Sequence, residues 1–151
     1  MPWGELTRIV RNGMRLDESS TLFFIFSKKG VQTFVVDLNT QGQLYQGVNS
    51  EGIELESIGG EYSPITKWLK GQEGLPFDRV TLYDTGEFYE SFTIIPDREG
   101  ITIQADTMKD GEDLQSRWGT SLLGLTDEST RLLAEYVIED IRGYLLEQIL
   151  R

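Results

Sequence analysis

The segment Leu82-Tyr83-Asp84-Thr85-Gly86 contains the residues whose types and spacing come nearest to a catalytic motif. An aspartate in an apolar-apolar-Asp-Thr-Gly loop can exchange protons with a second aspartate, because two close carboxylates cannot both ionise and share one proton instead. The same residues also suit a structural turn. In that turn Asp84 accepts hydrogen bonds from nearby backbone amides, Thr85 lies at the bend, and Gly86 adopts a positive φ angle.

A dimeric, retropepsin-like aspartic protease is therefore one alternative for this chain. The retroviral-type enzymes also carry a downstream apolar-apolar-Gly element, and Leu122-Leu123-Gly124 has this composition. The residues after Gly86 fit less well, since those enzymes place a small residue where this chain has Glu87 followed by two aromatic residues. A carboxylate beside Asp84 also brings charge repulsion into the site. We therefore favour the turn and expect no catalytic residue.

Composition excludes several other kinds of site. The 151 residues include no cysteine and no histidine, which removes disulfides, the usual metal ligands and the serine-histidine triad. The stretch Asp37-x-Asn39-x-Gln41-Gly42 imitates a calcium loop, but Val48 stands where the carboxylate of the twelfth position belongs. Glu51, Glu54 and Glu56 alternate with apolar residues, as in a short solvated strand. We expect neither a cofactor nor a metal.

The charge of the chain opposes binding to phosphate groups. It has 14 Lys and Arg against 25 Asp and Glu, a formal net charge of −11. We therefore expect no sequence-specific nucleic-acid partner and no membrane partner. The start of the sequence lacks the pattern of a secretory signal, and no apolar run approaches the roughly 20 residues that span a bilayer. These features predict a protein that is soluble where it is made.

Hydrophobic periodicity predicts helices over the first third of the chain. Apolar residues recur at helical spacing between Leu6 and Met14. The five apolar residues from Leu22 to Phe26 suit a strand or a buried helix, and the segment that follows slightly favours the helix. An amphipathic helix is predicted from Val31 to Gln46, with Asn39 and Gln43 on its polar side and a glycine directly after it.

The middle of the chain predicts shorter elements. Residues 47–60 have the composition of an exposed connection that contains a short strand. Ser63 caps a helix that has proline at its first position and ends at Gly71. Two β-rich runs, Ser91–Ile95 and Gly100–Ala105, predict an antiparallel hairpin.

The C-terminal segment has the clearest helical pattern. Residues 114–119 predict a helical turn closed by a glycine. Thr126 then caps a helix with an apolar stripe over about 24 residues. We predict an α+β fold in which this helix and the helix at 31–46 pack on a small antiparallel sheet. Large apolar residues of these segments are the candidates for core or subunit-interface positions: Phe88, Tyr89, Phe92, Trp118, Tyr136, Tyr144 and Ile149.

Several short motifs follow one another in a defined order. They are Gln43 to Gly52, Glu61 to Thr66, Lys70-Gly71-Gln72, Asp78 to Phe92 and Trp118 to Thr126. In order and spacing they resemble the neck, head-tail connector and tail-completion proteins of tailed phages, most of all those of crAss-like phages. The resemblance covers about residues 31 to 150. The sequence departs from the broader tail-completion group in its long acidic loop from Glu51 to Glu61.

The resemblance implies a virion structural protein that catalyses nothing. Such a protein is a subunit of a homo-oligomeric ring at the junction of portal and tail, made in the host cytoplasm, with the portal and other neck or tail proteins as partners. From the length of the chain we expect one structural domain over residues 1–151, and residues 1–30, which the resemblance does not cover, are a candidate peripheral helical arm. A ring needs two complementary patches per subunit, and the hairpin at 91–105 and the C-terminal helix are candidates. An acidic binding or inhibitor module is a third alternative.

Overall fold

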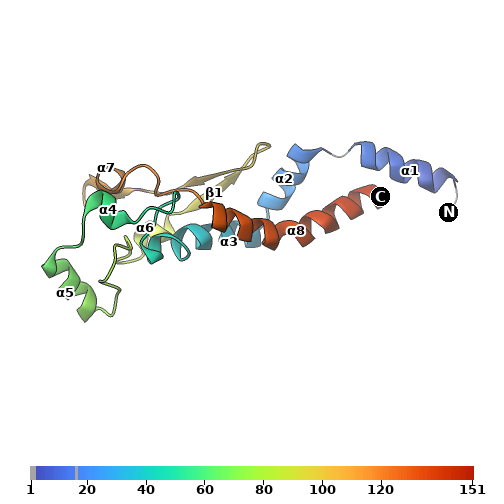
Figure 1. The fold of residues 1–151 in the computed structure, drawn as a ribbon. Helices are drawn as coiled ribbons and strands as arrows, with labels where there is room; N and C mark the ends of the chain where they lie inside the picture. The colour runs from blue at the N-terminus through green and yellow to red at the C-terminus, as the bar shows by residue number, and fades with distance from the viewer. Residues whose placement is uncertain (1–2, 16) are drawn as a thin grey trace.

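The computed structural model describes residues 3–15 and 17–151. It is an elongated α+β molecule, which confirms the predicted fold class (Figure 1). Two separate antiparallel sheets of two strands each are present instead of one sheet. The elements are α1 (Trp3–Met14), α2 (Glu18–Phe26), α3 (Lys29–Thr40), η1 (Leu44–Gln46), α4 (Leu55–Gly59), α5 (Pro64–Gln72), α6 (Glu87–Glu90), β1 (Thr93–Pro96), β2 (Ile101–Gln104), β3 (Met108–Lys109), β4 (Glu112–Asp113), α7 (Leu114–Trp118) and α8 (Asp127–Leu150).

Local capping explains where three of the helices begin. The Asp17 carboxylate accepts from the amide of Ser20 at the start of α2, so the segment at 22–26 is a helix, as favoured. The Ser63 hydroxyl accepts from the Thr66 amide and α5 starts at a proline, as predicted, although α5 continues one residue past Gly71. Thr126 caps the 24-residue α8. The amphipathic N-terminal segment is α1.

The helix predicted from Val31 to Gln46 is wrong at its C-terminal end. Helix α3 ends at Thr40, and a turn and the 3₁₀ helix η1 follow. The prediction placed Asn39 and Gln43 on a solvated side, whereas both are buried, with 0% and 1% of their surface exposed. Their amides bind backbone groups of residues 122–126, and these contacts favour a turn over a continued helix.

The strand predicted within residues 47–60 is also absent. One isolated bridge joins Val48 to Glu54, and α4 begins at the next residue, Leu55, which is fully buried. The Asn49 side chain holds the turn between them, because its oxygen accepts from the amides of Glu51 and Ile53 at 2.9 and 3.0 Å. A local side-chain acceptor of this kind competes with strand pairing.

The hairpin is present as β1 and β2, paired antiparallel from Thr93 opposite Gln104 to Pro96 opposite Ile101. Strand β1 lies on α2 and α3, and α8 runs along the same helices (Figure 1). The buried side chains form two clusters, one around α3, β1 and the first half of α8, and one around α4, α6 and α7. No helix within the described residues has the length and apolar character needed to cross a membrane.

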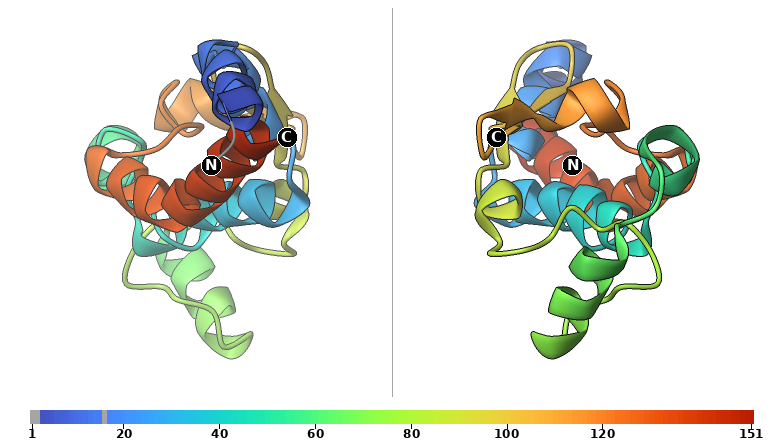
Figure 2. Two further views of the ribbon diagram at one scale, coloured as in Figure 1. Left: turned by 90° about the vertical axis from the view of Figure 1, so that its right-hand side faces the viewer. Right: turned by 90° about the vertical axis from the view of Figure 1, so that its left-hand side faces the viewer.

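Different helices form the two ends of the molecule. At one end α1 lies against the C-terminal part of α8, and at the other end α4 and α7 lie at the second core cluster (Figure 1). Helix α5 projects away from the rest of the chain in both end-on views (Figure 2). It therefore extends beyond the body of the molecule.

Candidate functional site

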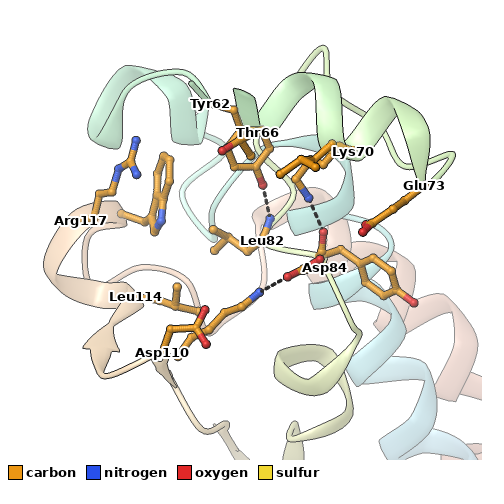
Figure 3. Close-up of a pocket in the computed structure, with 13 residues that line it drawn as sticks. Tyr62, Thr66, Lys70, Glu73, Leu82, Asp84, Asp110, Leu114 and Arg117 are labelled. Carbon is orange, nitrogen blue, oxygen red and sulfur yellow. Dashed lines mark hydrogen bonds and ion pairs between the residues drawn. The ribbon is translucent and has the colours of Figure 1, made fainter. Parts of the chain in front are cut away.

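A groove of about 440 Å³ lies between α5 and the segments that face it. We call it the α5 groove. Its walls are α5, the segment 82–84, the turn between β3 and β4, and α7 (Figure 3). Three cations and three carboxylates line it, together with apolar side chains such as Leu69 and Trp118. The groove therefore combines apolar wall area with charges of both signs.

Lys70 is a charged residue of the α5 groove whose side chain is almost completely buried. Only 7% of its surface is exposed, and its ammonium donates to the carbonyl oxygen of Tyr83 (Figure 3). The same ammonium lies 4.8 Å from the centre of the Tyr62 ring, a cation-π arrangement. A lysine ammonium has three donors. Lys70 therefore ties α5 to the segment that carries Asp84.

The backbone beside Lys70 is held in a strained conformation. Among the residues that the structure describes, Leu82 and Asp110 are the non-glycine positions with positive φ, at 56° and 51°, and both line the α5 groove. The Tyr62 hydroxyl accepts from the amides of Thr81 and Leu82, each at 3.1 Å. Strained backbone of this kind costs about 1–3 kcal/mol per residue and persists where surrounding contacts hold it.

The Asp84-Thr85-Gly86 segment forms the predicted turn, but with different contacts. Gly86 has a φ of 92° and precedes α6, and the Thr85 hydroxyl accepts from the Glu87 amide at 3.4 Å. The prediction that Asp84 accepts from local backbone amides is wrong. Its carboxylate instead lies 3.4 Å from the Lys109 ammonium, with half of its side chain exposed (Figure 3).

This arrangement offers Asp84 an ion pair across the α5 groove. In the dimeric protease alternative the second carboxylate would come from Asp84 of a second copy, whereas within the single chain the partner of Asp84 is the Lys109 ammonium. Within residues 3–15 and 17–151 no three acidic side chains lie together in a way that could hold a metal ion. The groove is therefore suited to binding a surface with both apolar and charged groups.

Four of the predicted core or interface residues lie in the core next to the α5 groove. Phe88, Tyr89, Phe92 and Trp118 are all buried in one cluster. The Tyr89 hydroxyl donates to the carbonyl of Thr81 at 2.6 Å, and burial raises the pKa of Tyr89 far above its usual range. Trp118 forms part of the groove wall. These residues support the groove from behind.

The other three candidates lie on α8 and contact their own chain. Tyr136 stacks on Phe34 with ring centres 4.1 Å apart, and Tyr144 stacks on Phe24 at 4.4 Å. The Ile149 carbonyl accepts from the Asn12 side chain at 3.2 Å, which ties α1 to the end of α8. Tyr136 and Tyr144 therefore stack within their own chain and Ile149 is held through its backbone carbonyl, and none of the three lines the α5 groove.

The outer side of α5 was not among the sequence-derived candidates. Ile65, Trp68 and Leu69 are 73%, 62% and 49% exposed. Their spacing of three and four residues places them on one side of the helix, and we call them the α5 face. Helix α5 thus buries a lysine and exposes its large apolar residues, the reverse of an ordinary surface helix. The sequence shows this spacing, but the pattern alone does not say which side points inward.

Comparisons of the chain with protein-family models, with curated proteins and with solved structures find no match.

Proposed function

We propose that this protein is a structural subunit of a homo-oligomeric ring at the portal-tail junction of a tailed phage. The resemblance of residues 31 to 150 to neck and connector proteins supports a place in a phage particle. A ring subunit also needs a surface through which the copies assemble. The α5 face is the observation that carries the proposal. Three large apolar side chains of α5 are exposed in the single chain, and exposed apolar patches of this kind mark interaction sites. The helix that carries them projects from the molecule (Figure 2).

The α5 face replaces the hairpin at 91–105 and the C-terminal helix as the candidate assembly surface. The hairpin and α8 pack on α2 and α3 of their own chain, and the aromatic residues of α8 stack within it. Among the residues that the structure describes, no such element covers the α5 face. We therefore place the subunit contact at α5 and assign the rest of the chain to supporting it.

The contacts of Asp84 favour a structural role over the protease alternative. Its carboxylate is half-exposed and already paired with Lys109, and this ion pair would have to break before Asp84 of a second copy could face it as the catalytic partner of a dimeric protease. Asp84→Asn therefore leaves the proposed function intact. A peptide-cleavage assay that compares wild type with Asp84→Asn separates the two classes, because only a protease shows cleavage that this substitution abolishes.

Analysis of purified virions by mass spectrometry tests the location. We expect peptides of this chain in mature particles at a fixed ratio to the portal protein, and we expect cells lacking the gene to accumulate filled capsids without tails. Absence of the chain from particles, together with normal particles in its absence, contradicts the proposal. The acidic surface gives a further expectation, since a net charge of −11 weakens binding to DNA passing through a ring.

A further inference from the structure

The hairpin of β1 and β2 has a defined hydrogen-bond register. At its turn the Asp97 amide donates to the Gly100 carbonyl at 3.0 Å. Hydrogen-bonded pairs alternate along an antiparallel ladder with pairs whose backbone groups point outward. The next pair, Pro96 with Ile101, therefore belongs to the second kind, which suits a proline because it has no N–H group to donate. Ile103, two positions further along β2, belongs to the same kind.

The backbone N–H and C=O groups of Ile101 and Ile103 thus point to the side of β2 that faces away from β1. Among the residues that the structure describes, no backbone hydrogen bond from another segment reaches these groups. Buried backbone groups are almost always paired, so unpaired groups at this place indicate an edge that is open to solvent. Strand β1, in contrast, lies on α2 and α3. The open edge of the hairpin is therefore that of β2.

The devices that normally protect a strand edge are missing from β2. Proteins block open edges with charged side chains, prolines or bulges. Residues 100–105 are Gly-Ile-Thr-Ile-Gln-Ala, without charge or proline, in a chain in which 26% of the residues are charged, and β2 pairs with β1 without a bulge. The nearest charged residues are Glu99 and Asp106, beyond the two ends of this strip. Two copies of a chain with a net charge of −11 can therefore meet along it without like charges at the centre of the contact.

An apolar hollow lies beside the open edge of β2. It has a volume of about 480 Å³, and Ile101 and Ile103 line it together with apolar side chains of α2 and of the segment before α8: Leu22, Phe26, Leu123 and Leu125. Side chains of directly opposite residues in an antiparallel pair lie on the same face. A strand that pairs with β2 through the backbone of Ile101 and Ile103 therefore directs the side chains opposite them toward this hollow.

We infer that β2 pairs antiparallel with β2 of a second copy, about a two-fold axis at Thr102. In this register Ile101 of each copy lies opposite Ile103 of the other, so every outward N–H and C=O group of these residues gains a partner. The isoleucine side chains face the hollows, and Thr102, which is exposed, lies opposite Thr102 of the second copy. A two-fold axis at Ile101 or at Ile103 would pair the outward groups of only one of the two isoleucines within β2.

This contact goes beyond the proposed function. A surface that meets itself closes with two copies and does not build a ring, and the contact uses neither the α5 face nor the α5 groove. It also leaves the packing of the hairpin on α2 and α3 intact, because only the free edge of β2 takes part. The dimer and the place of the chain in a virion can therefore be tested separately.

Amide hydrogen exchange, measured by NMR over increasing protein concentration, reports on the edge directly. The amides of Thr102 and Gln104 bond to β1, so they should be protected at every concentration. Those of Ile101 and Ile103 should exchange freely in the monomer and slow at least about tenfold as dimers form. Sedimentation gives the dimer fraction of the same samples. A chain that stays monomeric up to its solubility limit overturns the inference, and so does a dimer that leaves these two amides unprotected, as a contact through α5 would.

Substitutions at Thr102 test whether this residue meets its own copy. Thr102→Lys and Thr102→Glu each place two like charges across the axis and should weaken the dimer at least about fivefold, while a mixture of the two variants should form a heterodimer. Thr93→Lys is the matched control, because Thr93 is an exposed threonine on β1, away from the open edge. A mixture that pairs no better than the single variants overturns the two-fold register.

Ile103→Pro tests the backbone contact itself. Proline removes the outward N–H of Ile103 and none of the hydrogen bonds to β1, and prolines are tolerated on edge strands where the N–H faces solvent. We expect at least about tenfold weaker dimerisation with an unchanged circular dichroism spectrum, and Ile103→Val, which keeps the N–H, should dimerise like wild type. Dimerisation of a folded Ile103→Pro chain at the wild-type level would contradict strand pairing.

Discussion

The buried amide of Asn39 allows one quantitative prediction about how the α5 end of the molecule is held together. Its Nδ2 donates to the Leu122 carbonyl at 3.0 Å, and its Oδ1 accepts from the Gly124 amide at 2.8 Å. The side chain is fully buried. Asn39→Ala removes both bonds at once and leaves the two backbone groups without these partners.

The expected loss follows from these contacts. Leu122 is completely buried, and an unsatisfied buried carbonyl costs about 1–3 kcal/mol. Gly124 is partly exposed, so water can replace the bond to its amide, and we assign about 1 kcal/mol or less to that bond. With the small cavity left by the amide, the free energy of unfolding should fall by about 2–4 kcal/mol. This loss lowers the urea midpoint by roughly 1–2 M.

Urea unfolding followed by far-ultraviolet circular dichroism measures this change. Gln41→Ala is the matched control, because Gln41 directly follows α3 and is exposed, so its truncation should leave the midpoint unchanged. Asn39→Asp gives a second check. Its carboxyl group must be protonated to donate to the Leu122 carbonyl, so its destabilisation should lessen as the pH falls. An Asn39→Ala variant within about 0.5 kcal/mol of wild type would refute the role assigned to this amide.

Three further predictions concern the turn, the α4–α7 contact and the buried tyrosine. Gly86→Val forces a β-branched residue into a φ of 92° and should cost about 1–3 kcal/mol. Asp84→Asn removes one half-exposed ion pair and should cost less than about 1 kcal/mol; equal urea midpoints for the two variants would contradict this turn. Gly59→Ala places a methyl group 2.3 Å from the Trp118 ring, so the melting temperature should fall by the equivalent of about 1–3 kcal/mol, and an unchanged value would show that the ring does not abut Gly59. Because burial raises the pKa of Tyr89, the folded chain keeps a proton that the unfolded chain releases near pH 10, and stability should fall as the pH rises above about 10. Tyr89→Phe should have a shallower fall in its urea midpoint over this range, and identical slopes would exclude Tyr89 as the cause.

Elements that depend on local sequence were predictable. Thr126 caps α8 through the next residues, and the hairpin runs 93–96 and 101–104 carry their own β-rich pattern. Gly86 adopts the positive φ that its place after Asp84 and Thr85 indicates. In each case the determining contacts lie within a few residues, which is the range that periodicity and capping rules describe.

Elements that depend on distant contacts were not predictable. The end of α3 is determined by Asn39 and Gln43, whose amides reach backbone groups more than 80 residues away. A polar residue at helical spacing normally indicates the solvated side, so both were assigned to the wrong environment. The same limit applies to α5, where the burial of Lys70 depends on the Tyr83 carbonyl and the Tyr62 ring. No local pattern indicates that these acceptors come together.

The length of α8 has a mechanical consequence. Its first half is anchored in the core through Ser129, Leu133 and Val137, while its last turns carry α1. From Val137 to Leu150 the helix rises about 20 Å, so a tilt of about 5° at the anchor displaces the far end by nearly 2 Å by simple leverage. Small repacking around Val137 therefore becomes a larger movement of α1 relative to the core, and the stiffness of α8 determines how large that movement is.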